Sequence, residues 1–206
     1  EERHHESAFA LKVNVAKERD VQRMIEESIR KFSKIDILIQ NAAIGMKPKP
    51  LVDSSEELFD KLFNVNVKSI FLGAKNIIPV FQAQKSSGVI VNIVSTAAIR
   101  PRPGLTLYNA SKGALVPMTK SLALEVAEFN IRVNGICPVA GETPMLKDFL
   151  GERDPENAYK KFKSTIPLGR LALKSEYKSA IKFLVDKDSS FITGQNLIID
   201  GGRSVW

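Results

Sequence analysis

Residues 89–95 read Val-Ile-Val-Asn-Ile-Val-Ser, and this stretch decides the fold. Apart from Asn92, every residue from 89 to 94 is β-branched and apolar. β-Branched side chains favour strands, and a strand without polar alternation is covered on both faces. Such strands occur mainly in parallel sheets between layers of helices. The stretch therefore predicts an α/β protein.

Outward from this strand, the sequence alternates between strand and helix patterns. Toward the N-terminus it predicts a strand at residues 8–15, a helix with an apolar face from Val21 to Phe32, a buried strand at 35–39 and a long helix reaching about residue 84. Ser54 and Glu57 have the spacing of the capping box that starts such a helix. Toward the C-terminus it predicts a helix at 109–129, a strand at 131–137, a helix at 175–185 and a strand at 196–200.

This alternation predicts a single Rossmann-like domain over residues 1–206, a doubly wound parallel sheet with helices on both faces. Ligands of such sheets bind beyond the carboxyl ends of the strands. The turns after Val15, Ile39, Val94 and Cys137 are therefore the places to look for a site. Residues 139–167 show no strand pattern, and their glycines and prolines divide them into short helical pieces.

Composition excludes several classes of protein. The 206 residues are 44% hydrophobic and 26% charged, which suits one globular core. No run approaches the roughly 20 apolar residues of a membrane helix, and the first residues have no apolar signal-peptide core, so we expect a cytoplasmic protein without membrane contact. Cys137 is the only cysteine, and His4 and His5 are the only histidines, so we expect no disulfide and no metal site.

The chain is basic, with 30 lysines and arginines against 23 acidic residues. The densest basic stretch, residues 160–182, is interleaved with acids and apolar residues and resembles an ordinary solvated face. It also lacks the interleaved aromatic residues that a single-strand binding groove would need. We therefore expect no nucleic-acid partner.

Tyr108 and Lys112 lie four residues apart at the start of a predicted helix and so share one face. The spacing alone is weak evidence, because Tyr159 and Lys163 repeat it where no strand ends nearby. What distinguishes Tyr108 is Ser95, which closes a buried strand thirteen residues earlier and could fold back toward the tyrosine.

Ser95 followed by Tyr108-Asn109-Ala110-Ser111-Lys112 closely resembles the catalytic segment of the classical short-chain dehydrogenases/reductases. The resemblance extends over essentially the whole chain, and its pattern is nearest to 3-oxoacyl-carrier-protein reductases and to sugar or secondary-alcohol dehydrogenases. Four further stretches agree with the family in order and position: Asn41-Ala42-Ala43, Asn66 within residues 64–67, residues 138–143, and residues 191–195 with 200–202.

The resemblance implies a catalytic set of four residues. Tyr108 would be the general acid/base, because a neighbouring ammonium favours the phenolate of a group whose pKa is ordinarily near 10. Lys112 would supply that charge and hold the cofactor ribose, and Ser95 would donate a hydrogen bond to the substrate oxygen. Asn66 would join Lys112 to solvent through a water.

The resemblance also implies a set of residues for the cofactor, NAD or NADP. Asn14 and Val15 would lie beneath the adenine, with asparagine in place of the family's aspartate. Asn41, Ala42 and Ala43 would pass the adenosine ribose, with Gln40 and Ala43 as departures from the family's turn. Pro138, Gly141 and Thr143 would lie beside the nicotinamide, although Val139 replaces the family's glycine. Tyr108 and Lys112 complete the set.

The glycine-rich turn that binds the pyrophosphate is absent from the 206 residues. The family's strand order also leaves the strand at 8–15 without its neighbours and exposes an edge of the strand at 35–39. We therefore predict that the natural protein carries at least one more βαβ unit, of ~30 residues or longer, ahead of Glu1. The strand end that separates NAD from NADP is missing too, so the sequence does not choose between them.

The leading hypothesis is a carbonyl reductase or alcohol dehydrogenase, with residues 139–167 as the substrate lid. Its substrate could be a small alcohol or ketone, a sugar, or an acyl thioester on an acidic carrier. The alternative is a non-catalytic dinucleotide-binding regulator of the same fold. Family resemblance suggests a homotetramer or homodimer formed through the two long helices, with Leu115, Leu122 and Val126 assigned to either the interface or the core.

Overall fold

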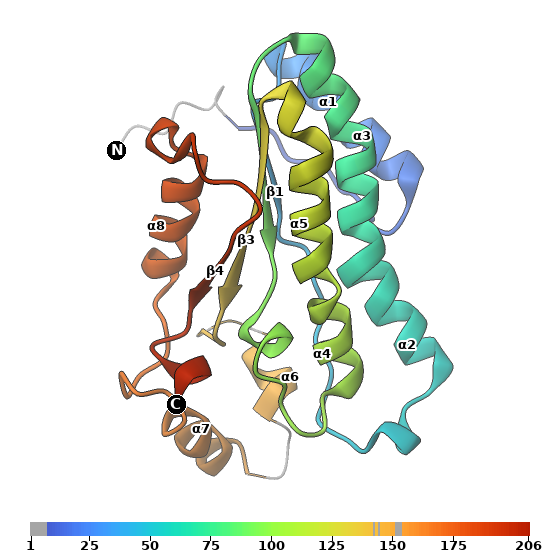
Figure 1. Cartoon of the computed structure of the whole chain (residues 1–206). Helices are drawn as coiled ribbons and strands as arrows, with labels where there is room; N and C mark the ends of the chain where they lie inside the picture. The colour runs from blue at the N-terminus through green and yellow to red at the C-terminus, as the bar shows by residue number, and fades with distance from the viewer. Residues whose placement is uncertain (1–7, 142, 144, 151–153) are drawn as a thin grey trace.

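The computed structural model describes residues 8–141, 143, 145–150 and 154–206. Its sheet has four strands in the order β1-β2-β3-β4: β1 Ile37–Gln40, β2 Gly88–Ile93, β3 Ile131–Pro138 and β4 Asn196–Ile199. Every neighbouring pair is parallel, as expected. The sheet is layered between helices (Figure 1).

The helices lie on both faces of the sheet, which confirms the doubly wound α/β prediction. On one face lie α1 (Glu18–Phe32), α3 (Ser69–Gln84) and α5 (Leu115–Val126), and on the other lies α8 (Lys174–Val185) (Figure 1). The remaining α-helices are α2 (Glu56–Phe63), α4 (Thr106–Gly113), α6 (Leu146–Leu150) and α7 (Pro155–Lys163).

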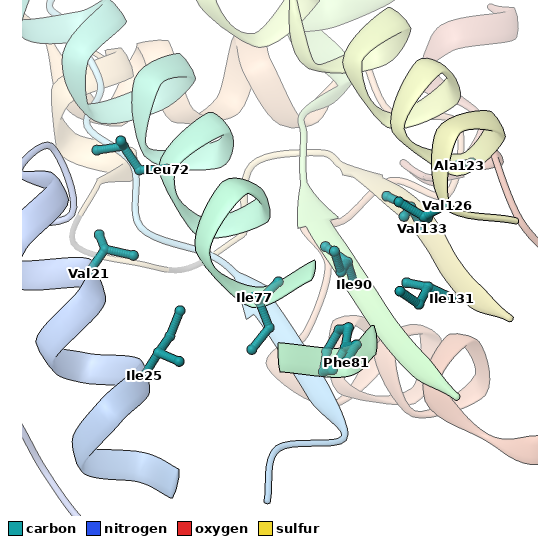
Figure 2. Packing of buried hydrophobic residues seen from close by; sticks show 10 residues of the cluster. All are labelled: Val21, Ile25, Leu72, Ile77, Phe81, Ile90, Ala123, Val126, Ile131 and Val133. Atoms are coloured by element: carbon teal, nitrogen blue, oxygen red, sulfur yellow. The ribbon is translucent and has the colours of Figure 1, made fainter. Parts of the chain in front are cut away.

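Figure 2 shows the larger apolar core, where α1, α3 and α5 meet β2 and β3. Phe81 is fully buried there, and burial of such a side chain contributes about 2–3 kcal/mol. β2 begins at Gly88, and a Cβ at this position would lie 2.2 Å from the Phe81 ring. The ring therefore requires a glycine at the start of the central strand.

Asn92 is the one polar residue in the strand with which the sequence analysis began, and it is completely buried. Its Oδ1 accepts a hydrogen bond from Gln40 Nε2 at 3.1 Å, and its Nδ2 donates to Thr119 Oγ1 at 2.9 Å. A buried amide is tolerated when its polar atoms are paired in this way. Asn92 thus joins β1, β2 and α5 without disturbing the apolar layer.

β1 lies at the edge of the sheet, as the sequence analysis expected, and Ile37 and Ile39 are 41% and 45% exposed, so this strand is less buried than its sequence indicated. The strand predicted at residues 8–15 is wrong, because these residues form no strand. An isolated segment gains no ladder hydrogen bonds, so its alternating pattern alone does not make it a strand. The N-cap of α2 is Ser55, whose side chain accepts from Leu58 N, and Ser54 lies one residue before it.

The two long predicted helices are each divided. The helix after residue 54 consists of α2, a π-helical turn at Asn64–Lys68, and α3. The helix predicted at 109–129 begins earlier, at Thr106, and is divided at Ala114 into α4 and α5, followed by a 3₁₀ turn at Ala127–Phe129. Pro117 falls in the first turn of α5, where a residue without an amide hydrogen is tolerated.

The described residues of 139–167 include α6, α7 and Gly141, which forms a β-bridge with Ala172. The two helices fit the predicted short helical pieces. Across the described part of the chain, no helix is both long enough and apolar enough to span a bilayer.

Candidate active site

A cleft of about 510 Å³ opens where β1, β2 and β3 end. Its lining includes the residues that directly follow these three strands, namely Asn41, Val94 and Val139, and Ser95 comes next after Val94. This is where a doubly wound sheet binds its ligands. Nine of the site residues predicted from the sequence line it: Asn41, Ala42, Ala43, Ser95, Tyr108, Lys112, Pro138, Gly141 and Thr143.

Ser95 turns the chain from β2 into the cleft. Its backbone is extended, and its Oγ accepts a hydrogen bond from Ala97 N at 3.1 Å, which caps the 3₁₀ turn Thr96–Ala98. The same side chain lies beside Tyr108, where it acts to lower the pKa of the phenol. The thirteen-residue spacing noted in the sequence therefore does bring Ser95 and Tyr108 into one cleft.

Tyr108 lies in α4 and is only 5% exposed. Burial raises the pKa of its phenol, while the Ser95 hydrogen bond and the charge of Arg102 act in the opposite direction. Arg102, a residue that the sequence analysis did not select, thus adds a positive charge that favours the phenolate. The same role for Lys112 stays a prediction.

Lys112 lies one helical turn from Tyr108 and is 3% exposed. Its ammonium donates a hydrogen bond to the carbonyl of Ile93 at 2.8 Å, at the end of β2. Burial lowers its pKa to about 8. An ammonium has three donors, so two remain available for acceptors that enter the cleft, such as ribose hydroxyls.

Asn66 is buried in the π-helical turn and does not line the cleft. Its Oδ1 accepts from Ile44 N at 2.9 Å, and its Nδ2 donates to Ile44 O and to Ser111 Oγ, both at 3.0 Å. Ser111 Oγ in turn donates to Tyr108 O at 2.8 Å. Asn66 therefore ties the segment after β1 to the helix that carries Tyr108, and its side chain makes no hydrogen bond to Lys112.

The residues predicted for the cofactor fall into two groups, those that line the cleft and those that do not. Asn41, Ala42 and Ala43 offer a small, open wall, and Gly141 packs so closely that a Cβ there would lie 2.9 Å from the Tyr177 ring. The predicted adenine residues are different, because neither Asn14 nor Val15 lines the cleft. Asn14 instead lies in the turn that precedes α1: its Oδ1 accepts from Ala16 N at 3.0 Å, and its backbone N–H donates to Asp20 Oδ2 at 2.8 Å.

Sequence reasoning did not select several large side chains of the cleft, among them Arg102, Phe149, Phe162, Tyr177 and Arg203. They come from five separate segments and follow no motif or periodic pattern, so only the folded chain identifies them. The described residues contain no group of histidine, cysteine or acidic side chains suited to a metal. His4 and His5 lie outside the described residues.

The comparisons agree with this geometry. A family model described as enoyl-(acyl carrier protein) reductase matches residues 1–204. The 4-formylbenzenesulfonate dehydrogenase of Comamonas testosteroni is 40% identical over 96% of this chain and 78% of its own, and the cyclopentanol dehydrogenase of a Comamonas species is 37% identical over 95% and 76%.

A solved structure of 3-ketoacyl-(acyl-carrier-protein) reductase from Brucella melitensis, complexed with NADH, superimposes with a TM-score of 0.89 at 43% identity. It covers 96% of this chain and 79% of its own. The extent of these matches and the Ser95–Tyr108–Lys112 cleft lead to one conclusion: this chain belongs to the short-chain dehydrogenase/reductase family, as an NAD(P)-dependent oxidoreductase that interconverts alcohol and carbonyl groups.

Proposed function

We propose that Tyr108 is the general acid/base of this oxidoreductase, with Ser95 and Lys112 acting beside it. The observation that carries the proposal is that the Ser95, Tyr108 and Lys112 side chains line one cleft, with Ser95 close enough to Tyr108 to act on its pKa. The bound cofactor would supply or accept the hydride. In reduction, the Tyr108 hydroxyl gives its proton to the substrate oxygen while the Ser95 hydroxyl donates a hydrogen bond to that oxygen.

The surroundings of Tyr108 support this role. Because Arg102 favours the phenolate, a positive charge is in place to stabilise the anion that remains after proton transfer. The free donors of Lys112 would hold the ribose hydroxyls, and Asn41, Ala42, Ala43, Pro138, Gly141 and Thr143 would complete the cofactor wall. Asn66 acts as a positioning residue, because it holds α4 through Ser111.

Residues 139–167 would form the substrate lid. Val139, Met145, Phe149 and Phe162 from this segment line the cleft, and apolar walls of this kind exclude water from the reacting groups. The substrate would thus be enclosed between the lid and α4.

An oligomer, a homotetramer or a homodimer, would form through the long helices. Leu115 and Val126 are buried in the core, and Leu122 packs against it, so they are not its contacts. Phe59, Phe71 and Leu124 are 43%, 50% and 82% exposed on the outward faces of α2, α3 and α5. Light scattering of the purified protein tests this proposal, and a monomer would contradict it. A cytoplasmic location stays a prediction from composition.

The function is tested by following nicotinamide absorbance with NAD and NADP forms of the cofactor against a panel of secondary alcohols, ketones, aldehydes and acyl thioesters. Ser95→Ala serves as the site variant, because it removes the hydroxyl beside Tyr108. Turnover that falls sharply in Ser95→Ala supports the proposal. A folded protein that binds cofactor tightly but turns over nothing in the panel would favour the non-catalytic regulator.

A further inference from the structure

The cleft contains two arginines that the proposed chemistry does not fully use. Arg102 lies in the turn before α4, and Arg203 lies in the 3₁₀ turn after β4 and is only 7% exposed. Both line the same cleft as Tyr108 and Lys112. Their guanidinium groups both lie against the ring of Phe162, at 4.6 Å and 5.2 Å from its centroid.

Neither guanidinium forms an ion pair within residues 8–141, 143, 145–150 and 154–206. The side chain of Arg102 donates to the carbonyl of Phe149 at 3.3 Å, and that of Arg203 donates to Thr165 Oγ1 at 3.0 Å. A guanidinium has five donors, so most of the hydrogen-bonding capacity of both groups remains open.

The charges around these arginines are unbalanced. Burial and the charge of Arg203 lower the pKa of Arg102, and burial and Arg100 lower that of Arg203. Asp200 opposes the effect at Arg203, but its two oxygens accept the backbone amides of Gly202 and Ser204 at 3.0 Å and 2.7 Å. Buried cations without a counter-ion are costly, and an entering anion would remove that cost.

We propose that Arg102 and Arg203 bind an anionic oxygen group of the substrate, so that the enzyme acts on a small carbonyl compound, or its alcohol, that carries a carboxylate or sulfonate. This inference rests on the proposed function and adds the substrate class. Planar guanidinium groups match carboxylate and sulfonate oxygens, and Phe149, Phe162 and Leu105 line the cleft with apolar surface for the spacer.

Binding of a non-reactive probe tests the proposal independently of turnover. The full-length protein, saturated with NAD⁺, is titrated calorimetrically with 4-methylbenzoate and with the neutral 4-methylbenzamide. We expect the acid to bind about tenfold more tightly or better, as charge-assisted hydrogen bonds predict. Saturation with NAD⁺ ensures that the cofactor's own anionic groups cannot account for the preference.

Arg102→Gln should remove this preference and leave binding of the amide within about twofold, which also shows that the variant is folded. Arg102→Lys should retain part of it, because the charge remains without the planar fork. Arg19→Gln, an exposed arginine on α1, is the matched control for net charge and should bind both probes like the unmodified protein.

Turnover completes the test with 4-formylbenzoate and 4-formylbenzamide. Because Arg102 also acts on Tyr108, Arg102→Gln should lower kcat for acid and amide alike. A preference for the acid of about tenfold in kcat/KM that the variant loses through KM supports the inference. Turnover without any preference, or equal increases in KM for acid and amide in Arg102→Gln, would overturn it while the oxidoreductase stands. Anion-selective binding without turnover of either compound would instead count against the proposed function.

Discussion

The chain contains the same tyrosine–lysine spacing twice, in α4 and in α7, but the burial and the neighbours of the two pairs differ. Tyr108 and Lys112 are buried in the cleft, where Ser95 lies beside the tyrosine and the lysine donates a hydrogen bond to the carbonyl of Ile93 at the end of β2. In α7, Lys163 is exposed, and Tyr159 packs against the apolar cluster of residues 139–172. A shared helical face becomes a site only where strand ends converge on it.

The sharpest test of this contrast is removal of each phenol hydroxyl. Tyr108→Phe should lower kcat by roughly 10²–10⁴-fold, the range for loss of a general acid/base. Tyr159→Phe, the matched change in α7, should leave kcat within about twofold. Steady-state turnover in both directions measures the two effects, and equal losses would remove the distinction between the two helices.

The lysines should differ next in magnitude. Lys112→Met should weaken cofactor binding by about tenfold to a hundredfold, because charge-assisted hydrogen bonds in a buried site are lost. Lys163→Met should leave it unchanged. Fluorescence titration with NADH and NADPH measures both, and unaltered affinity in Lys112→Met would show that its ammonium serves only Ile93.

Burial of Lys112 also predicts a pH dependence of stability. Its folded pKa is about 8, below the ordinary 10.5, so between these values the unfolded state binds more protons and stability increases with pH. From about pH 7 to about pH 9.5, the free energy of unfolding of the unmodified protein should rise by roughly 2 kcal/mol relative to Lys112→Met. Denaturant unfolding without cofactor gives the difference. The difference in unfolding free energy between the unmodified protein and Lys163→Met should not change with pH. A difference from Lys112→Met that also did not change with pH would contradict the lowered pKa of Lys112.

The smallest expected effect comes from a second pair of identical residues, the adjacent serines Ser54 and Ser55 at the start of α2. Ser55→Ala should destabilise the protein by about 1 kcal/mol, because it removes the cap of α2. Ser54→Ala should be neutral or slightly stabilising, because Ser54 Oγ is buried without a partner among the described residues. Thermal unfolding of both variants measures the two changes in stability. A larger loss of stability in Ser54→Ala than in Ser55→Ala would show that Ser54 is the cap.

Much of the architecture could be predicted because its signals are local. The apolar face of α1, the continuous strands β2 and β3 and the position of Ser95 follow from periodicity and side-chain shape within short windows. The strand at residues 8–15 failed for a non-local reason, since strand formation requires a hydrogen-bonded neighbour. The sequence likewise did not decide which residues of α5 face the core. In the structure Leu115 and Val126 are buried and Leu124 is exposed, because α5 packs on the sheet.

The sequence by itself determined the doubly wound fold and placed Ser95, Tyr108 and Lys112 at one end of it, because these depend on chain order and on which residues follow each strand. Only the tertiary structure decided which groups surround Tyr108. Arg100 and Arg203 lie about a hundred residues apart in the chain, yet the side chain of Arg100 donates to the carbonyl of Arg203. The charge of Arg203 in turn acts on Arg102, which interacts with Tyr108. Contacts over such separations leave no periodic trace in a sequence, because they arise from packing of whole elements and not from the conformation of any one of them.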